Sequence, residues 1–119
     1  MKKVLWVSRH EMTAEQKADL DRIMGGEARL LPWKETVRDI QALTPLLRQA
    51  DAVAAVLPLE LLSQLLELSE GKPVLRAVCD REMTGRTILT PDGRQELDVH
   101  YVHRCWQRLL RVEVETEDL

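Results

Sequence analysis

Short apolar runs alternate with amphipathic stretches along the first two thirds of the chain. Four of these runs are short, continuous and rich in Val, Leu and Ala, which is typical of strands that a sheet buries on both faces. They span residues 3–8, 28–33, 51–57 and 74–79. The segments between them have apolar positions at i, i+3 and i+4 spacing, so we expect helices at about 13–24, 36–50 and 59–69.

Local signals mark the ends of these helices. Thr13 and Gln16 have the spacing of a capping box, and Gly25-Gly26 ends the helix that they begin. Thr44-Pro45 lies inside the second helical region, where an N-cap followed by proline favours a break and a restart. The sequence therefore predicts one kinked helix or two short ones there.

Strands and helices alternate as β-α-β-α-β-α-β, with connections of only a few residues. This order predicts an α/β fold, a Rossmann-like parallel sheet of about four strands with flanking helices and right-handed crossovers. The last third changes period. Pro91-Asp92-Gly93 between β-prone runs indicates a hairpin that continues to about His103, and residues 110–115 alternate like a half-exposed strand. We interpret residues 1–119 as a single domain.

Composition and charge exclude several classes of protein. The 119 residues are 45% hydrophobic and 31% charged, as in an ordinary globular domain. The net charge of −3 argues against a protein that coats long DNA or RNA. The apolar runs are too short for a membrane span or a signal peptide. With only Cys79 and Cys105, no disulfide framework is expected, so we predict a reduced, cytoplasmic protein without membrane contact.

Polar and cationic residues follow the strands of this predicted sheet. In an open parallel sheet, ligands bind beyond the carboxyl ends of the strands, where helix N-termini also favour phosphate. The candidate ligand-binding residues at this edge are Ser8, Arg9, His10, Thr13, Trp33, Lys34, Leu57, Pro58, Arg81 and Thr84. Together they predict a pocket for a small anionic ligand.

Arg9 and His10 suggest chemistry as well as binding. An imidazole exchanges protons near neutral pH, and a guanidinium can hold a phosphate through two hydrogen bonds. The alternative is that His10 only solvates a loop end. A metal site at His100, His103 and Cys105 is disfavoured, because residues 100 and 103 point to opposite faces of a strand.

Other familiar sites are not indicated by the sequence. It contains no GxGxxG, Walker A or GxSxG motif, so nucleotide cofactors and α/β-hydrolase chemistry are disfavoured and no cofactor is expected. Cys79 is better interpreted as a buried structural thiol than as a nucleophile. Leu61, Leu62, Leu65, Leu66 and Leu68 form a leucine stripe that is broad for so small a chain, which favours a homodimer.

The opening Val4-Leu5-Trp6-Val7-Ser8-Arg9-His10-Glu11-Met12-Thr13-Ala14-Glu15-Gln16 resembles the start of small CRISPR-associated ring nucleases of type III systems, which are related to CARF domains. Several of these begin with an apolar strand, a Ser-His or Ser-Arg-His element and then Leu-Thr-x-Glu-Gln. Met12 stands here in place of that leucine. A phage or mobile-element relative would share the same features.

The resemblance implies a Rossmann-like homodimer that binds a cyclic oligoadenylate across its two-fold axis, with cyclic tetra-adenylate as the first candidate. It also implies metal-independent cleavage, in which a ribose 2′-OH attacks the adjacent phosphate. Ser8, Arg9 and His10 would then be catalytic, with His10 as acid or base. Two alternatives remain open: a sensor or sponge that binds without cleaving, and a small subunit that recruits a protein partner.

Overall fold

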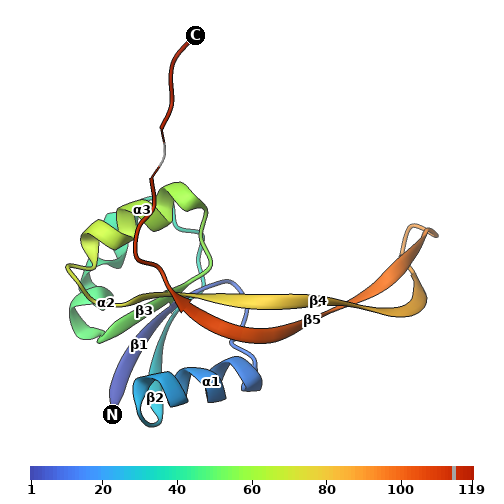
Figure 1. The fold of residues 1–119 in the computed structure, drawn as a ribbon, viewed down its shortest axis with the longest axis horizontal. Coiled ribbons are helices and arrows are strands. Elements are labelled where there is room, and N and C mark those ends of the chain that lie inside the picture. The colour runs from blue at the N-terminus through green and yellow to red at the C-terminus, as the bar shows by residue number, and fades with distance from the viewer. Residues whose placement is uncertain (114) are drawn as a thin grey trace.

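The fold is an α/β arrangement in this computed structural model, which describes residues 1–113 and 115–119 (Figure 1). Its elements in chain order are β1 (Lys2–Val7), α1 (Ala14–Met24), β2 (Ala28–Trp33), a 3₁₀ turn (Ile40–Leu43), α2 (Thr44–Gln49), β3 (Ala52–Ala55), α3 (Leu59–Leu68), β4 (Val74–Leu89) and β5 (Gln95–Arg108). The strands form a sheet in the order β2-β1-β3-β4-β5. The first four run parallel, as the sequence predicts, and β5 pairs antiparallel with β4.

Helices cover both faces of the sheet. Successive side chains of β1 point to opposite faces, so Val4 and Trp6 pack with Leu20 of α1, while Leu5 and Val7 belong to a second apolar cluster. This second cluster is built with the 3₁₀ turn, α2 and α3. It also takes in the leucine stripe: Leu62 and Leu65 are buried, and Leu61, Leu66 and Leu68 pack against the cluster. The stripe is therefore core, and the leucine exposure that favoured a homodimer does not occur there.

The local signals place most boundaries correctly. The capping box of α1 is confirmed, with Thr13 accepting from the backbone of Gln16 and the Gln16 side chain accepting from that of Thr13. β2 has the expected bounds, and its Pro32 lies on an edge strand, where a missing N–H is tolerated. The break at Thr44-Pro45 gives two short helical pieces, the 3₁₀ turn and α2. No helix in the described part of the chain is long and apolar enough to cross a bilayer.

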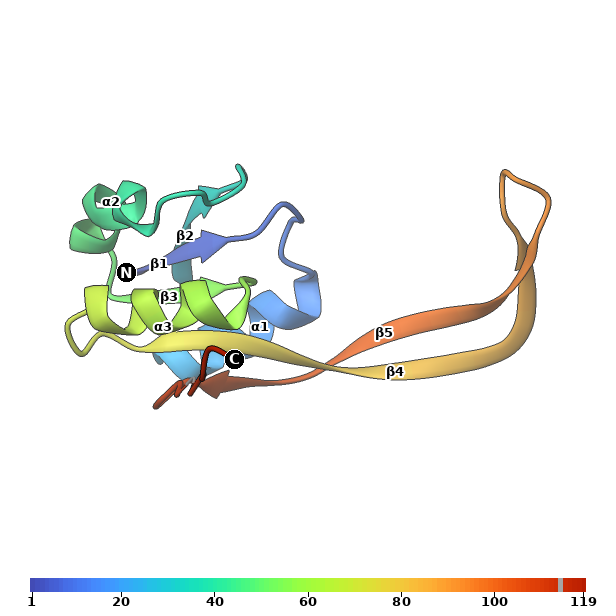
Figure 2. The same ribbon diagram turned by 90° about the horizontal axis from the view of Figure 1, so that it is seen from above.

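The hairpin is much longer than the sequence predicts. The turn lies where it was expected, but β4 continues past Cys79 to Leu89, and β5 continues past His103 to Arg108. The prediction of a buried thiol at Cys79 is wrong, because this part of β4 has left the sheet and the residue is exposed. β3 pairs with β4 only at Val74 and Leu75, so the rest of the hairpin leaves the sheet as a two-stranded ribbon (Figure 2). We refer to residues 80–102 as the arm. The arm and the C-terminal tail enlarge the radius of gyration to 16.8 Å, against about 13.5 Å for a compact chain of this length.

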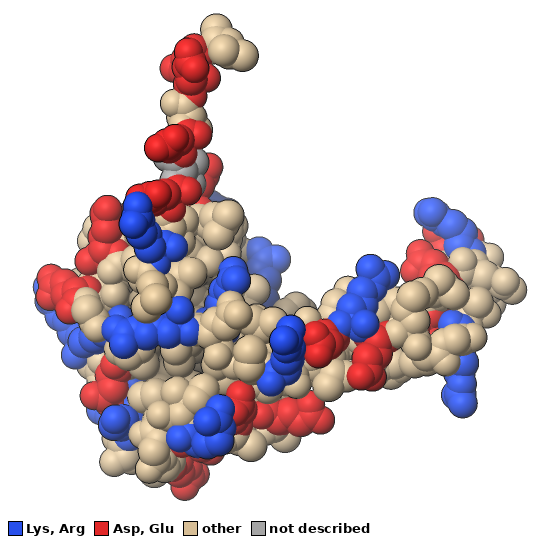
Figure 3. Space-filling view, in the orientation of Figure 1, with Lys and Arg blue, Asp and Glu red and all other residues tan. Residues whose placement is uncertain are grey.

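The prediction of a strand at 110–115 is wrong for the residues described there, and Val114 lies outside them. The reason is the absence of a strand to pair with. The backbone N–H of Leu109 donates to the carbonyl of Val74, the first residue of β4, at 2.7 Å. Beyond that point β4 offers no further partner, and the chain leaves the sheet with its acidic residues exposed (Figure 3).

Candidate functional site

A cavity of about 280 Å³ opens at the carboxyl ends of β1 and β3. It lies where the strand order reverses, because β2 is on one side of β1 and the later strands are on the other. This reversal is where open α/β sheets place their ligands. The lining residues are Val7, Ser8, Arg9, His10, Glu35, Thr36, Val37, Val56, Leu57, Pro58 and Leu61.

The loop after β1 is held by three hydrogen bonds. The backbone N–H of Ser8 donates to the carbonyl of Trp33 at 3.1 Å, and the Ser8 hydroxyl accepts from the backbone N–H of His10 at 3.1 Å. The indole N–H of Trp6 donates to the carbonyl of His10 at 3.0 Å. Ser8 is therefore buried as a loop anchor, whereas the side chains of Arg9 and His10 are exposed at the cavity.

Arg9 connects this cavity to a second one. Its guanidinium donates to the hydroxyl of Thr36, and both residues line both cavities. The second cavity, of about 690 Å³, is also lined by Trp33, Lys34 and Arg38. Three cations thus lie beside the strand ends, where they can bind phosphate oxygens, and the carboxylates of Glu35 and Asp39 are on the same lining.

Trp33 and Lys34, both expected from the sequence, lie at this second cavity. The indole N–H of Trp33 is buried and has no hydrogen-bond partner among the described residues. The ammonium of Lys34 lies 3.6 Å from a carboxylate oxygen of Glu11, and both side chains are exposed. An exposed pair of this kind contributes little to stability, so Lys34 remains available to an anion.

The loop after β3 forms the opposite wall. The backbone N–H of Val56 donates to the carbonyl of Val7 at 2.9 Å, which ties the ends of β1 and β3 together. Leu57 and Pro58 line the cavity as expected. Pro58 precedes α3 and offers no side-chain cap, so the first-turn amides of that helix keep their positive potential at the cavity. The carboxylate of Glu35, which also lines the cavity, counteracts this positive potential.

Three residues expected at the site lie elsewhere. Thr13 does not line either of these cavities, and its hydroxyl caps α1. Arg81 and Thr84 lie on the arm, where the Thr84 hydroxyl donates to a carboxylate oxygen of Asp98 at 3.0 Å. Their placement at the strand ends was wrong because β4 does not end at Cys79 but carries both residues past the edge of the sheet.

The sequence also misses lining residues that follow β2, namely Glu35, Thr36, Val37 and Arg38. The apolar spacing of Val37, Ile40 and Leu43 predicts a helix from about residue 36, which hides these positions inside a regular element. In the structure, helical conformation begins only at Ile40, after Asp39 accepts a hydrogen bond from the backbone N–H of Gln41. The signal that could have found them is the rule that loops after parallel strands meet at one edge.

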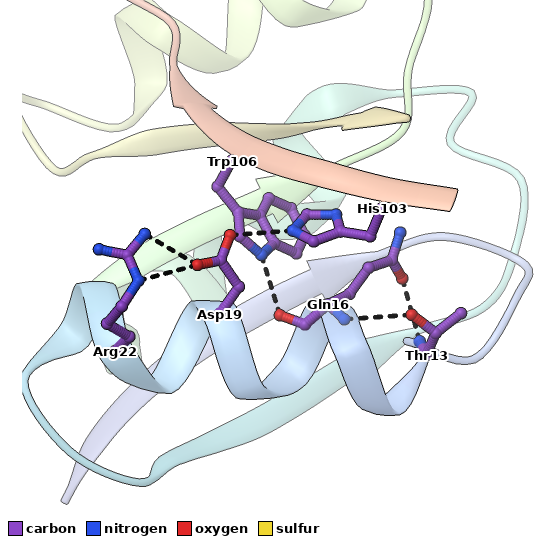
Figure 4. Close-up of polar contacts among 6 residues, drawn as sticks. All are labelled: Thr13, Gln16, Asp19, Arg22, His103 and Trp106. Atoms are coloured by element: carbon purple, nitrogen blue, oxygen red, sulfur yellow. Dashed lines mark hydrogen bonds and ion pairs between the residues drawn. The ribbon is translucent and has the colours of Figure 1, made fainter. Parts of the chain in front are cut away.

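A second polar cluster lies where the hairpin meets α1 (Figure 4). His103 and Trp106 of β5 contact Asp19 and Gln16 of α1. The hydrogen bond from His103, and then that from Arg22, holds the pKa of the Asp19 carboxyl below its ordinary value of 3.8. The imidazole Nε2 of His100 lies 3.3 Å from a carboxylate oxygen of Asp98, on the other face of the ribbon. The imidazoles of His100 and His103 therefore lie on opposite faces of β5, as strand geometry predicts.

Comparisons with protein-family models, with curated proteins and with solved structures find no match to this chain.

Proposed function

We propose that this chain binds a cyclic oligoadenylate at the cavity between β1 and β3 and opens the ring without a metal. The observation that carries the proposal is the loop after β1, which holds Arg9 and His10 at a cavity where the strand order reverses. Two cations of the adjoining cavity, Lys34 and Arg38, extend the surface that can hold phosphates.

The relation to CARF-like ring nucleases, with their Rossmann-like fold, is part of this proposal. It is supported by the order of elements at the start of the chain: an apolar strand, the Ser-Arg-His loop and a helix capped by Thr13 and Gln16. Cyclic tetra-adenylate is the first ligand to test. The same proposal places the protein in the cytoplasm, as a homodimer that switches off a type III CRISPR signal or as its counterpart from a mobile element.

The reaction needs little beyond positioning and charge. A ribose 2′-oxygen attacks the adjacent phosphorus, the bond to the 5′-oxygen breaks, and the product ends in a 2′,3′-cyclic phosphate. The 2′-OH loses a proton and the leaving 5′-oxygen gains one; His10 would carry out one of these two transfers and water the other. Arg9 would stabilise the charge that develops on the phosphoryl oxygens.

Binding without cleavage is a second candidate, and one observation favours it. The side chain of His10 is exposed, and the hydrogen bonds that this residue makes within the described residues are those of its backbone, so its imidazole has no partner there that orients it. A catalytic imidazole is usually oriented by such a partner. A sensor or sponge needs the cations but not an oriented base.

The test is incubation of the protein with cyclic tri-, tetra- and hexa-adenylate, followed by chromatography of the ligand and a thermal-shift measurement. A raised melting temperature with conversion to linear product, lost in His10→Ala, supports the enzyme. His100→Ala, on the arm, is the matched control and should leave conversion unchanged. A shift with all ligand recovered intact supports the sensor or sponge, and no shift with any ring contradicts both.

A further inference from the structure

Among the described residues, the arm is a two-stranded ribbon with which no third strand pairs. From Asp80 to Val102, β4 and β5 pair only with each other, because β3 leaves β4 at Leu75. A two-stranded hairpin is marginally stable alone in water. Something beyond its own pairing is needed to hold so long a ribbon extended.

The two faces of the arm differ in chemistry. Residues paired across the strands share a face, and alternate pairs face opposite ways. One face, which we call the apolar face, carries Met83, Leu89, Leu97, Val99 and Tyr101, together with Thr87, Gln95 and one charged residue, Arg81. The other, which we call the acidic face, carries Asp80, Glu82, Glu96 and Asp98, together with His100, Ile88 and Val102. The carboxylates of the acidic face are readily solvated by water. On the apolar face, in contrast, the large side chain of Tyr101 is 72% exposed.

The apolar face continues a surface that is already covered. His103 and Trp106 lie on the same face of β5 as Tyr101, and α1 packs over both of them. Within the described residues no element continues this cover over residues 97–101, where Leu97 and Tyr101 are exposed. Exposed apolar patches of this kind usually mark an interaction surface.

A second exposed apolar patch lies on the body of the molecule. Val56, which follows β3 and also lines the cavity between β1 and β3, is 62% exposed, and Leu59, the first residue of α3, is 56% exposed. The exposed carboxylate of Glu60 lies beside them and forms no ion pair among the described residues. We call Val56, Leu59 and Glu60 the edge patch.

The direction of the arm relates these two surfaces. β4 is parallel to β1 and β3 and continues beyond their carboxyl ends, so the arm projects from the edge that carries the edge patch (Figure 2). The ten β4 residues of the arm span about 33 Å. Two copies that face each other edge to edge would therefore each extend an arm alongside the other's edge patch, as a two-fold axis requires.

We propose that the apolar face of the arm packs on the edge patch of a second copy of this chain. The contact matches apolar side chains with apolar side chains, and it brings Arg81, the one charge of the apolar face, near the partner's unpaired carboxylate. The acidic face remains in water. A second copy is chosen as the occupant because the arm projects past the edge that carries the patch and because Arg81 and Glu60 have opposite charges. The inference also rests on the homodimer of the proposed function.

Sedimentation velocity of the full chain, without ligand and over a range of concentrations, tests the contact. We expect a species of twice 13.7 kDa. Tyr101→Lys on the apolar face and Leu59→Lys in the edge patch should each give a monomer. The matched controls are Val102→Lys, on the acidic face of the arm, and Ile23→Lys, an exposed apolar position on α1, and both should remain dimeric.

A mixture makes the test more specific. A two-fold dimer has two equivalent arm-to-patch contacts, so the two monomeric variants each lose both of them. Mixed together, Tyr101→Lys supplies an intact edge patch and Leu59→Lys supplies an intact arm, which restores one contact. We expect dimer to reappear in the mixture. Likewise Arg81→Glu should weaken the dimer, and adding Glu60→Arg should restore it.

Several results would overturn the inference. A wild-type monomer at every concentration would do so, as would a dimer that Tyr101→Lys leaves intact. Circular dichroism and tryptophan fluorescence establish that each variant is folded, and Leu59→Lys lies outside the hairpin in any case. Because no ligand is present, a dimer with this pattern that binds no oligoadenylate would contradict the proposed function and leave the contact standing.

Discussion

The imidazole Nε2 of His103 lies 2.9 Å from a carboxylate oxygen of Asp19, 84 residues earlier in the chain. This contact joins β5, at the base of the arm, to α1 (Figure 4). Three positions further along β5, the indole N–H of Trp106 donates to the carbonyl of Gln16 at 2.9 Å, and its ring meets that of Trp6 edge to face. The arm therefore projects from a base that is fixed to the body by specific contacts.

The Asp19 contact predicts how stability depends on pH. The pKa of Asp19 is lowered in the folded protein by the His103 hydrogen bond first and by Arg22 second. Folding therefore favours the ionised carboxylate. Its contribution to stability is present above the ordinary value of 3.8 and is lost as the pH falls through the lowered folded pKa.

The measurement is the melting temperature of wild type and Asp19→Asn at about pH 7 and at lower pH. We expect the variant to be less stable near neutrality and the difference to narrow below the ordinary pKa. Asp118→Asn, in the exposed tail, is the control and should match wild type throughout. A difference in melting temperature between wild type and Asp19→Asn that stays constant down to strong acid would refute the assigned role of the carboxylate.

Trp106 contributes both packing and a hydrogen bond. It is 7% exposed and belongs to the cluster on the α1 face. Trp106→Ala should cost about 3–5 kcal/mol of unfolding free energy, because a large aromatic side chain is lost from that cluster. Trp106→Phe keeps a ring but removes the N–H, and should cost about 1 kcal/mol from the hydrogen bond, plus a packing loss. Urea denaturation measures the unfolding free energy of both variants. Equal losses in Trp106→Ala and Trp106→Phe would show that the hydrogen bond is not separable from the packing.

Thr13 is expected to act on stability and not on the ligand. Its hydroxyl accepts from the Gln16 backbone at 3.1 Å and does not line the cavity. Thr13→Ala should lower the unfolding free energy by about 1 kcal/mol, whereas Thr13→Ser should keep the cap. Oligoadenylate affinity, measured by calorimetry on both folded variants, should equal that of wild type. A selective loss of affinity in Thr13→Ala would return this residue to the binding site.

The parallel part of the fold could be predicted from the sequence because its signals are local. A capping box, glycines after α1 and a proline after β3 mark where elements begin and end, and short connections leave few topologies. The arm could not be predicted in the same way. Strand length along residues 79–90 depends on pairing with β5, and the residues of that stretch are exposed in β4, so they carry no burial pattern that reveals the strand.

The site could be predicted where strands ended as expected. Ser8 to His10 follow β1 directly and Leu57-Pro58 follow β3 after Val56, and they line one cavity, as the rule for parallel sheets predicts. Arg81 and Thr84 failed the same rule because their strand continued. Thr36 and Arg38 could not be predicted in this way, because the apolar spacing indicates a helix one turn too early. The carboxyl end of β2 lies beside that of β1, which borders the reversal point.

Arg9 is the residue on which the proposed anion site depends most. It is exposed, lines both cavities and is held toward Thr36 by a hydrogen bond, so it is oriented before any ligand arrives. Arg9→Ala should weaken oligoadenylate binding by roughly 10- to 150-fold, the range for losing a charge-assisted hydrogen bond of about 1.5–3 kcal/mol. Thr36→Val should give a smaller loss, because the guanidinium stays but its orientation is no longer fixed.

Arg29→Ala is the matched control for charge. Arg29 is an exposed cation on β2 that lines neither of the two cavities, so its removal changes the net charge of the protein equally but leaves the site intact. Affinity should then fall only by the small, salt-screened amount that a distant charge contributes. If Arg9→Ala and Arg29→Ala weakened oligoadenylate binding equally, the ligand would be attracted by the overall charge of the surface. That result would contradict the cavity between β1 and β3 as the binding site.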